Sequence, residues 1–212
     1  MAVERDRHHR GRGLRERVAA GWEQVVAERE SRLGPDDPDT QSGRMQLADA
    51  YLRLGRTDDR RVIHERVIES WGRLADVRSR RLGLMHPDTT AACERHAYCH
   101  RLIGRSDDEV ALVKQIAADH ERLLGPDDPR TLRALARLAF RYGEGDWESP
   151  TAIALGERII GDAYDALGPE DEAVGALRAM LFVSYTQVGR TGDAHALHTR
   201  FPTPGDNDEA GC

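Results

Sequence analysis

Leu33-Gly34-Pro35-Asp36-Asp37-Pro38-Asp39-Thr40 is the stretch that decides the fold of this 212-residue chain, because versions of it recur along the sequence. Glycine can end a helix in a left-handed conformation, and the following proline prevents the helix from continuing. Aspartate caps the next helix, and a second proline suits its first turn. Each version therefore predicts a corner between two helices. The later versions cover residues 82–89, 124–131 and, in decayed form, 167–172.

The corners begin at residues 33, 82, 124 and 167, which gives spacings of 49, 42 and 43 residues. Such periods are typical of stacked helical repeats. A Gly-Arg pair at Gly55, Gly104 and Gly189 marks a second turn within a repeat, so each repeat is predicted to be two helices. The first spacing exceeds the second by seven residues, close to two helical turns, and the extra length follows Gly55. We therefore expect a longer helix there, with its buried face unchanged.

The chain is predicted to divide into three parts. Residues 1–12 carry charge without helical periodicity and are expected to be a flexible arm. Residues 13–200 are expected to form a helical repeat domain of about four repeats, preceded by one N-terminal helix that caps the stack. Residues 201–212 are expected to be a disordered acidic tail.

Composition argues against several classes of protein. The net charge of −6 lacks the basic excess that a general nucleic-acid binder needs. No window offers the ~18 uninterrupted apolar residues of a membrane span, and the first residues lack a secretory signal. We therefore expect a cytoplasmic protein that binds neither nucleic acid nor membrane. Its cysteines, Cys93, Cys99 and Cys212, are too few for a disulfide scaffold and are expected to be reduced.

The first corner is followed by Leu47-Ala48-Asp49-Ala50-Tyr51-Leu52-Arg53-Leu54-Gly55-Arg56. This combination resembles the 42-residue tetratricopeptide repeats (TPR) of kinesin light chains and many bacterial relatives, and the likeness covers roughly residues 14–199. It departs from the pattern at Leu84-Met85, at the Gly145-Asp146 turn and in the fourth corner. The resemblance implies an all-α, right-handed superhelical solenoid of antiparallel helix pairs, whose first helices line a concave groove for an extended peptide.

Arginine and aromatic residues occupy the positions that the resemblance assigns to this groove. Arg133, Arg137 and Arg141 follow one another at i, i+4 and i+8 with no acid among them. Arginine binds carboxylates bidentately and stacks on aromatic rings, and the resemblance implies acidic peptides with an embedded aromatic residue. We therefore predict a non-enzymatic protein–protein interaction module for an acidic or C-terminal peptide. The predicted groove residues are Arg53, Arg95, Tyr98, Arg101, Arg133, Arg137, Phe140 and Arg141.

A competing interpretation is a solvated face whose arginines pair with the Asp-rich corners. The end helices of the stack would also permit a homodimer. No phosphate loop, nucleophile elbow or triad order is present in the sequence, which favours a non-enzymatic protein without a cofactor. A small-molecule pocket between helices is a further alternative that no residue pattern locates.

Residues 93–100 suggest a different chemistry. Cys93, His96 and His100 are spaced i, i+3 and i+7, which places them on one side of a helix with Cys99 at the flank. Zinc or copper(I) accepts such ligands, so the alternative function is a metal- or cofactor-binding sensor or catalyst. A fourth ligand would have to come from another helix, and His64 and His120 are the candidates. The structural interpretation is that the cysteines pack as small apolar residues and each histidine is satisfied by one hydrogen bond.

Overall fold

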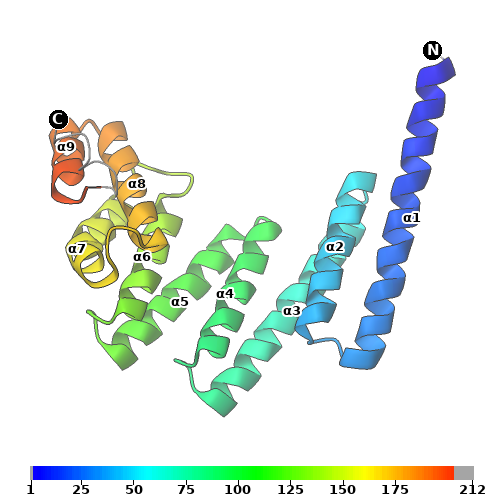
Figure 1. Cartoon of the computed structure of the whole chain (residues 1–212), viewed down its shortest axis with the longest axis horizontal. Helices are drawn as coiled ribbons and strands as arrows, with labels where there is room; N and C mark the ends of the chain where they lie inside the picture. The colour runs from blue at the N-terminus through cyan, green and yellow to red at the C-terminus, as the bar shows by residue number, and fades with distance from the viewer. Residues whose placement is uncertain (1, 203–212) are drawn as a thin grey trace. The chain divides into compact units, whose positions relative to one another are not determined.

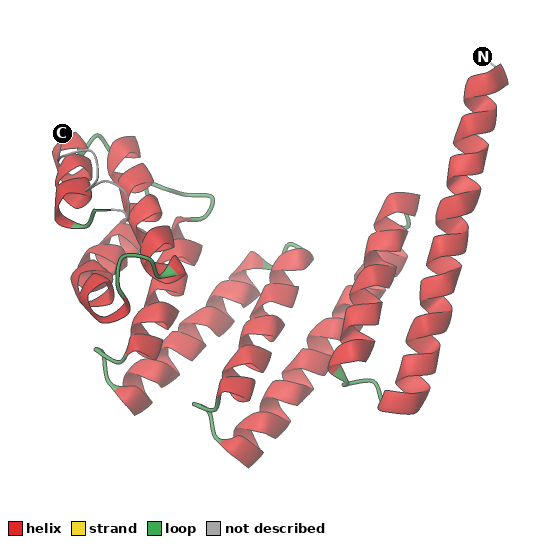
Figure 2. Cartoon of the chain, viewed as in Figure 1, coloured by secondary structure: helices red, strands yellow, loops and turns green. Residues whose placement is uncertain are grey.

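The computed structural model describes residues 2–202, with side chains described from residue 11 onward. Within that range the chain consists of nine α-helices and contains no strand, which confirms the all-α prediction (Figures 1 and 2). The helices belong to two compact units, Met1–Glu109 and Val110–Cys212. None of the described helices is long and apolar enough to span a membrane.

The first unit is built from consecutive antiparallel helices, as Figure 1 shows. Each of its first three helices packs against the next one along the chain. The core between the first three contains Leu47, Ala48 and Tyr51 on the second helix, beside Val26 on the first and Ile63 on the third. The helices of this unit are α1 (Ala2–Leu33), α2 (Pro38–Leu54), α3 (Thr57–Leu82), α4 (Pro87–Leu102) and the start of α5 (Ser106–Leu124).

The second unit contains the rest of α5 and the last four helices. Here α6 packs against both α7 and α8, and α8 packs against α7 and α9. Fully buried side chains from α6 and α8 form the centre of the core, including Leu132, Leu177 and Leu181. The helices are α6 (Pro129–Gly143), α7 (Pro150–Leu167), α8 (Glu172–Gln187) and α9 (Thr191–Arg200).

The predicted corners are present, with one difference in backbone conformation. Asp37, His86, Asp128 and Asp171 each cap the next helix, and each accepts a hydrogen bond from the backbone N–H two residues on. The corner glycine has a positive φ but an extended ψ, as at Gly168 (φ 86°, ψ 163°), instead of the expected left-handed helical conformation. That region of backbone space is essentially restricted to glycine. The corner is therefore fixed by the absence of a side chain.

The Gly-Arg turn is held by a cluster of polar groups. The Tyr51 hydroxyl donates to Glu23 on α1 at 2.7 Å, and the Arg56 guanidinium lies 4.2 Å from the centroid of the Tyr51 ring. Arg56 also pairs with Asp59 at 2.7 Å. The last repeat contains the same arrangement in Tyr185, Glu157, Arg190 and Asp193.

The ends of the repeat domain differ from the predicted boundaries. Helix α1 begins at Ala2, so the backbone of the expected flexible arm is helical. At the other end Phe201 is only 7% exposed, and its ring centroid lies 5.2 Å from that of Tyr164. Phe201 is therefore part of the core rather than of a tail. Residues 203–212 of the expected acidic tail lie outside the described residues.

Candidate functional site

Arg53 lies beside a pocket between α1 and α2 in the first unit. The pocket has a volume of about 420 Å³, and its lining includes the apolar side chains of Leu14 and Val18, which are 56% and 44% exposed. Arg15 and Ala50 complete it. Neither Arg15 nor Arg53 makes a hydrogen bond or ion pair within the described chain. We call this site the Arg53 pocket: two unpaired guanidinium groups beside exposed aliphatic side chains.

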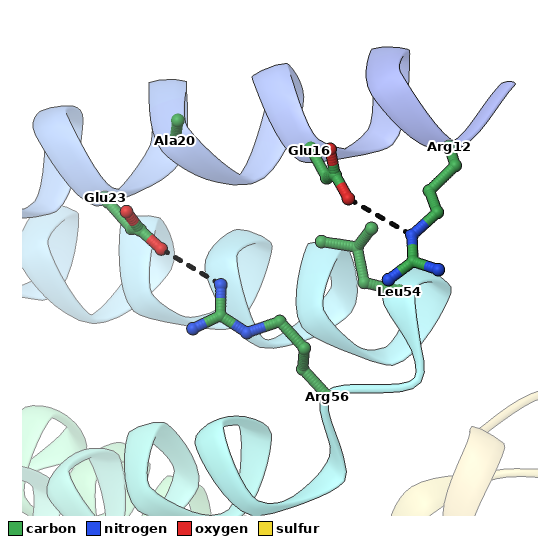
Figure 3. Close-up of a pocket in the computed structure, with 6 residues that line it drawn as sticks. All are labelled: Arg12, Glu16, Ala20, Glu23, Leu54 and Arg56. Carbon is green, nitrogen blue, oxygen red and sulfur yellow. Dashed lines mark hydrogen bonds and ion pairs between the residues drawn. The ribbon is translucent and has the colours of Figure 1, made fainter. Parts of the chain in front are cut away.

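A neighbouring pocket between the same two helices has matched charges instead. It measures about 300 Å³ and is drawn in Figure 3. Arg12 pairs with Glu16 at 3.1 Å on α1, and Arg56, in the turn that follows α2, pairs with Glu23 of α1 at 3.5 Å. Each guanidinium there already has a carboxylate partner. The contrast identifies the Arg53 pocket as the one with charge to offer a ligand.

The α4 face comprises Arg95, Tyr98 and Arg101, which were predicted as groove residues. Arg95 is exposed and makes no ion pair within the described residues, and Tyr98 is 40% exposed. The Arg101 guanidinium lies 5.0 Å from the centroid of the Tyr98 ring and 3.6 Å from Glu109. Of the two arginines on this face, Arg101 has an acidic neighbour and Arg95 has none among the described residues.

The α6 face comprises Arg133, Arg137, Phe140 and Arg141 in the second unit. Arg133 and Arg137 are exposed, but Arg133 donates from Nη2 and Nε to Asp171, the cap of α8, at 2.8 and 3.1 Å. Burial of Asp171 acts to raise its pKa, and the hydrogen bonds from Arg133 and the Ala173 amide outweigh it, so the pKa lies below its usual value. Arg133 thus follows the competing interpretation, in which arginines pair with the corners.

The side chains at the C-terminal end of the α6 face also have partners within the chain. Arg141 pairs with Glu144, and its guanidinium lies 5.3 Å from the centroid of the Phe140 ring. Trp147 packs edge-on against the same ring, with centroids 6.0 Å apart. Phe140 is consequently half-buried between two neighbours rather than presented to a ligand.

The helices that carry these residues do not all adjoin. In the first unit α2 and α4 each pack against α3, and no packing of α2 directly on α4 is found in the described chain. The Arg53 pocket and the α4 face are therefore separate sites. In the second unit α6 and α8 do pack on each other, which lets Arg133 reach Asp171.

The side chains of the Cys/His cluster on α4 lie in different surroundings. Cys99 is 4% exposed and packs with Val67 and Ile68, and burial raises the pKa of its thiol to about 11. A thiol with that pKa is protonated at neutral pH and is a poor metal ligand. The His96 ring packs on α3 where Gly72 leaves room for it: a methyl group there would lie 3.3 Å from the imidazole.

His100 lies close to another histidine and to an aspartate. The rings of His96 and His100 are 5.1 Å apart, and His100 Nδ1 lies 3.4 Å from Asp108. Burial, followed by the nearby His100, lowers the pKa of His96. Among the described residues no group of three or more His, Cys, Asp or Glu side chains is arranged to hold a metal ion. The predicted zinc or copper site therefore has no support in the arrangement of these side chains.

Solved structures with a similar arrangement of helices include those of two proteins. Two crystal structures of nearly identical TPR-like repeats, from a kinesin-light-chain-type protein of P. anserina, are each 23% identical to this chain. Both alignments cover 93% of this chain and 90% of that one, with TM-scores of 0.56 and 0.55. BtubC (BKLC) from P. vanneervenii is 15% identical over 88% and 89% of the two chains, with a TM-score of 0.53.

The chain has a TPR-like repeat fold. The resemblance seen in the corners and the Leu-Gly-Arg turn is thus confirmed for the fold. No protein-family model and no curated protein matches the chain. In the TPR-like repeats α2, α4, α6 and α8 are the first helices of their pairs, so the predicted groove residues lie on first helices, as expected.

Three members of the Arg53 pocket were missed as functional residues in the sequence. Leu14 and Val18 belong to an apolar stripe that predicts core, yet both are more than two-fifths exposed. Arg15 lies between them and attracts no attention in an arginine-rich helix.

Proposed function

We propose that this TPR-like chain is a non-enzymatic protein-interaction module whose principal site, the Arg53 pocket, binds an acidic peptide segment that carries an apolar side chain. The observation that carries the proposal is the pair of unpaired guanidinium groups, Arg15 and Arg53, beside exposed Leu14 and Val18. A partner carboxylate would gain a charge-assisted hydrogen bond there without first displacing an internal acid. Arg95 on the α4 face offers a second contact of the same kind.

The surroundings of the pocket favour a partner with both kinds of group. Guanidinium groups attract acids and speed their encounter, while aliphatic walls favour an apolar side chain of the same peptide. The chain as a whole carries a net charge of −6, which opposes nonspecific attraction of polyanions. The proposed ligand is therefore a short acidic segment rather than a nucleic acid.

Fluorescence anisotropy with defined peptides tests the proposal. The probes are labelled ten-residue peptides in which one leucine is flanked by Asp and Glu, beside copies with Asn and Gln in place of the acids. The test variant is Arg15→Glu/Arg53→Glu. The matched control is Arg32→Glu/Arg80→Glu, which makes the same charge change at two exposed arginines of the first unit that already have acidic neighbours.

The acidic peptide should bind the test variant about tenfold or more weakly than the wild type, because both proposed carboxylate partners are reversed in charge. The control should stay within about twofold, and the neutral peptide should bind none of the proteins tightly. Equal affinity for the test and control variants, with unchanged helix content, contradicts the proposal.

A further variant in the same binding experiment tests the α6 face. Arg133→Glu/Arg137→Glu should leave binding to the Arg53 pocket unchanged, because Arg133 is already paired with Asp171. Loss of binding in this variant alone would instead place the peptide on the α6 face, as the sequence suggested.

A further inference from the structure

Arg178 on α8 is a buried guanidinium without an acidic partner. The residue is 7% exposed, and its Nε is completely covered without donating a hydrogen bond to any partner. It makes no other hydrogen bond or ion pair within the described chain. Proteins normally pair a buried charge, because removing an ion from water without a partner is costly. Arg178 is therefore expected to meet an anion that comes from elsewhere.

The same position in the first repeat shows the partners that such an arginine takes. Arg44 and Arg178 each stand eleven residues after the corner leucine of their repeat. Arg44 is 4% exposed and donates from Nε and Nη2 to the Glu30 carboxylate at 2.9 and 2.6 Å. Its Nη1 donates to the Pro35 carbonyl at 3.1 Å and to the Ser70 hydroxyl at 3.0 Å. A carboxylate is the main partner at this place in the fold.

The last repeat keeps a proline, Pro169, at the place of Pro35 but lacks the glutamate and the glutamine beside the arginine. Tyr164 occupies the place of Glu30, and its hydroxyl donates to the Pro202 carbonyl instead. Gly175 occupies the place of Gln41, which lies 3.4 Å from Arg44 in the first repeat. A methyl group added at Gly175 would meet no atom within 4 Å, so the space is open.

The open space forms a pocket between α8 and α9, both of which belong to the second unit. Its volume is about 240 Å³, against about 30 Å³ for one water molecule, so it can hold more than solvent. The ring of Phe182, which is 43% exposed, lies 5.7 Å from that of His198 across the pocket. The lining residues are Gly175, Arg178, Ala179, Phe182, Leu197 and His198. A guanidinium beside apolar walls suits a carboxylate carried on a hydrocarbon chain.

We propose that this α8/α9 pocket is a carboxylate-binding site with the Arg178 guanidinium as its anchor. The planar fork of arginine can match the two oxygens of a carboxylate, and in the first repeat two nitrogens of Arg44 donate to one oxygen of Glu30. The site is separate from the Arg53 pocket and does not depend on the proposed function. The carboxylate comes either from a partner peptide or from Asp206, Asp208 and Glu209, which follow α9 in this chain.

Binding of a peptide copy of residues 203–212 to the full chain tests the site. The probe is fluorescein-labelled and has serine in place of the cysteine; a second copy has Asn and Gln in place of its acids. The proteins are the wild type, Arg178→Gln, Gly175→Gln and a chain with a neutral tail (Asp206→Asn/Asp208→Asn/Glu209→Gln). Arg158→Gln is the matched control, because it removes an exposed arginine of the same unit that pairs with Glu121.

The acidic probe should bind the neutral-tail chain at least about tenfold more tightly than it binds the same chain carrying Arg178→Gln. Gly175→Gln keeps the arginine but supplies the side chain that Gln41 supplies in the first repeat, so it should also block binding. If the tail is the natural source, the wild type binds the probe several-fold more weakly than the neutral-tail chain. Equal affinity of these two chains assigns the site to a partner peptide.

Thermal unfolding provides a readout that does not need the ligand. Arg44→Met should lower the melting temperature of the neutral-tail chain, because it leaves the partly buried Glu30 without its partner. Arg178→Met should keep or raise it, because the change removes an unpaired buried charge. A fall as large as that of Arg44→Met, or probe binding that Arg178→Gln leaves unchanged in a folded chain, overturns the proposal.

Discussion

Gly168 shows how one residue fixes a corner between helices. Its backbone has φ 86° and ψ 163°, and its N–H still donates to the Tyr164 carbonyl at 3.0 Å. The chain therefore keeps the last helical hydrogen bond of α7 and then leaves in a direction open only to glycine. A side chain at this position would be strained even though no neighbouring atom lies within 4 Å.

Replacing the corner glycine should destabilise the protein more than replacing a helical one. We expect Gly168→Ala to lower the free energy of unfolding by about 1–3 kcal/mol. Gly161→Ala, within α7 and also without a neighbour within 4 Å, should raise it by about 0.5–1 kcal/mol. Urea titration of both variants measures the difference. Similar values for the two substitutions would show that the corner tolerates a side chain.

The buried tyrosines of the Gly-Arg turns predict a loss of stability at high pH. Burial, and then the hydrogen bond to Glu23 or Glu157, raises the pKa of Tyr51 and of Tyr185 to about 12. The unfolded value is about 10, so folding favours the protonated phenol. This stabilisation is complete below pH 10 and is lost as the pH rises from about 10 to about 12.

Tyr51→Phe/Tyr185→Phe should therefore weaken the pH dependence of unfolding in that window. At neutral pH each substitution should cost about 1 kcal/mol, because one buried hydrogen bond to a carboxylate is lost. Tyr98→Phe is the control, since Tyr98 is 40% exposed. Chemical denaturation at pH 8, 10 and 11.5 measures both effects, and an unchanged alkaline slope in the double variant would contradict the explanation.

Helix α3 illustrates how far the elements could be predicted from the sequence. The corners and Gly-Arg turns bound most of the helices, and the seven extra residues after Gly55 appear as an α3 of 26 residues against 19 in α5. The surroundings of α4 could not be predicted in this way. Whether Cys99 packs with Val67 and whether His96 packs at Gly72 depend on which helix lies opposite, and repeat spacing does not specify the side chains across an interface.

Pairing of arginines with the Asp-rich corners was one interpretation of the sequence, but the sequence could not specify that Arg133 of α6 pairs with the corner before α8. Arg133 and Asp171 are 38 residues apart in the sequence. The sequence alone does not distinguish an arginine that forms an ion pair from one that does not. The predicted arginine row was correct as a helix face. Its charge is partly neutralised because α6 and α8 pack on each other, which lets Arg133 pair with Asp171, and because Arg141 pairs with Glu144.

Asp171→Asn should release Arg133 without removing the cap of α8. Asparagine still accepts a hydrogen bond from the helix N-terminus, so stability should fall by less than about 1 kcal/mol near neutral pH. The depressed pKa of Asp171 means that the stabilisation from this pair is present above pH ~4 and is lost as the pH falls. Acid titration of unfolding should therefore be less steep in the variant, and an identical acid transition would contradict the role of the pair.

The whole molecule contains two compact units, and each has its own buried side chains. Leu47 and Ile63 belong to the core of the first unit, and Leu132 and Leu177 to that of the second. In repeat proteins stability is approximately a sum of contributions from each repeat and its neighbours. A local change should therefore loosen its own unit before it affects the other.

Native-state hydrogen exchange can measure this independence. Gly168→Ala should accelerate amide exchange in α7 and α8 while α2 and α3 keep their wild-type rates, because the strained corner belongs to the second unit. Arg44→Met should have the opposite pattern, since it breaks the buried network of Glu30, Pro35 and Ser70 in the first unit. Equal acceleration in both units by either variant would mean that the chain opens as one cooperative body, and that the two cores stabilise each other as strongly as each stabilises itself.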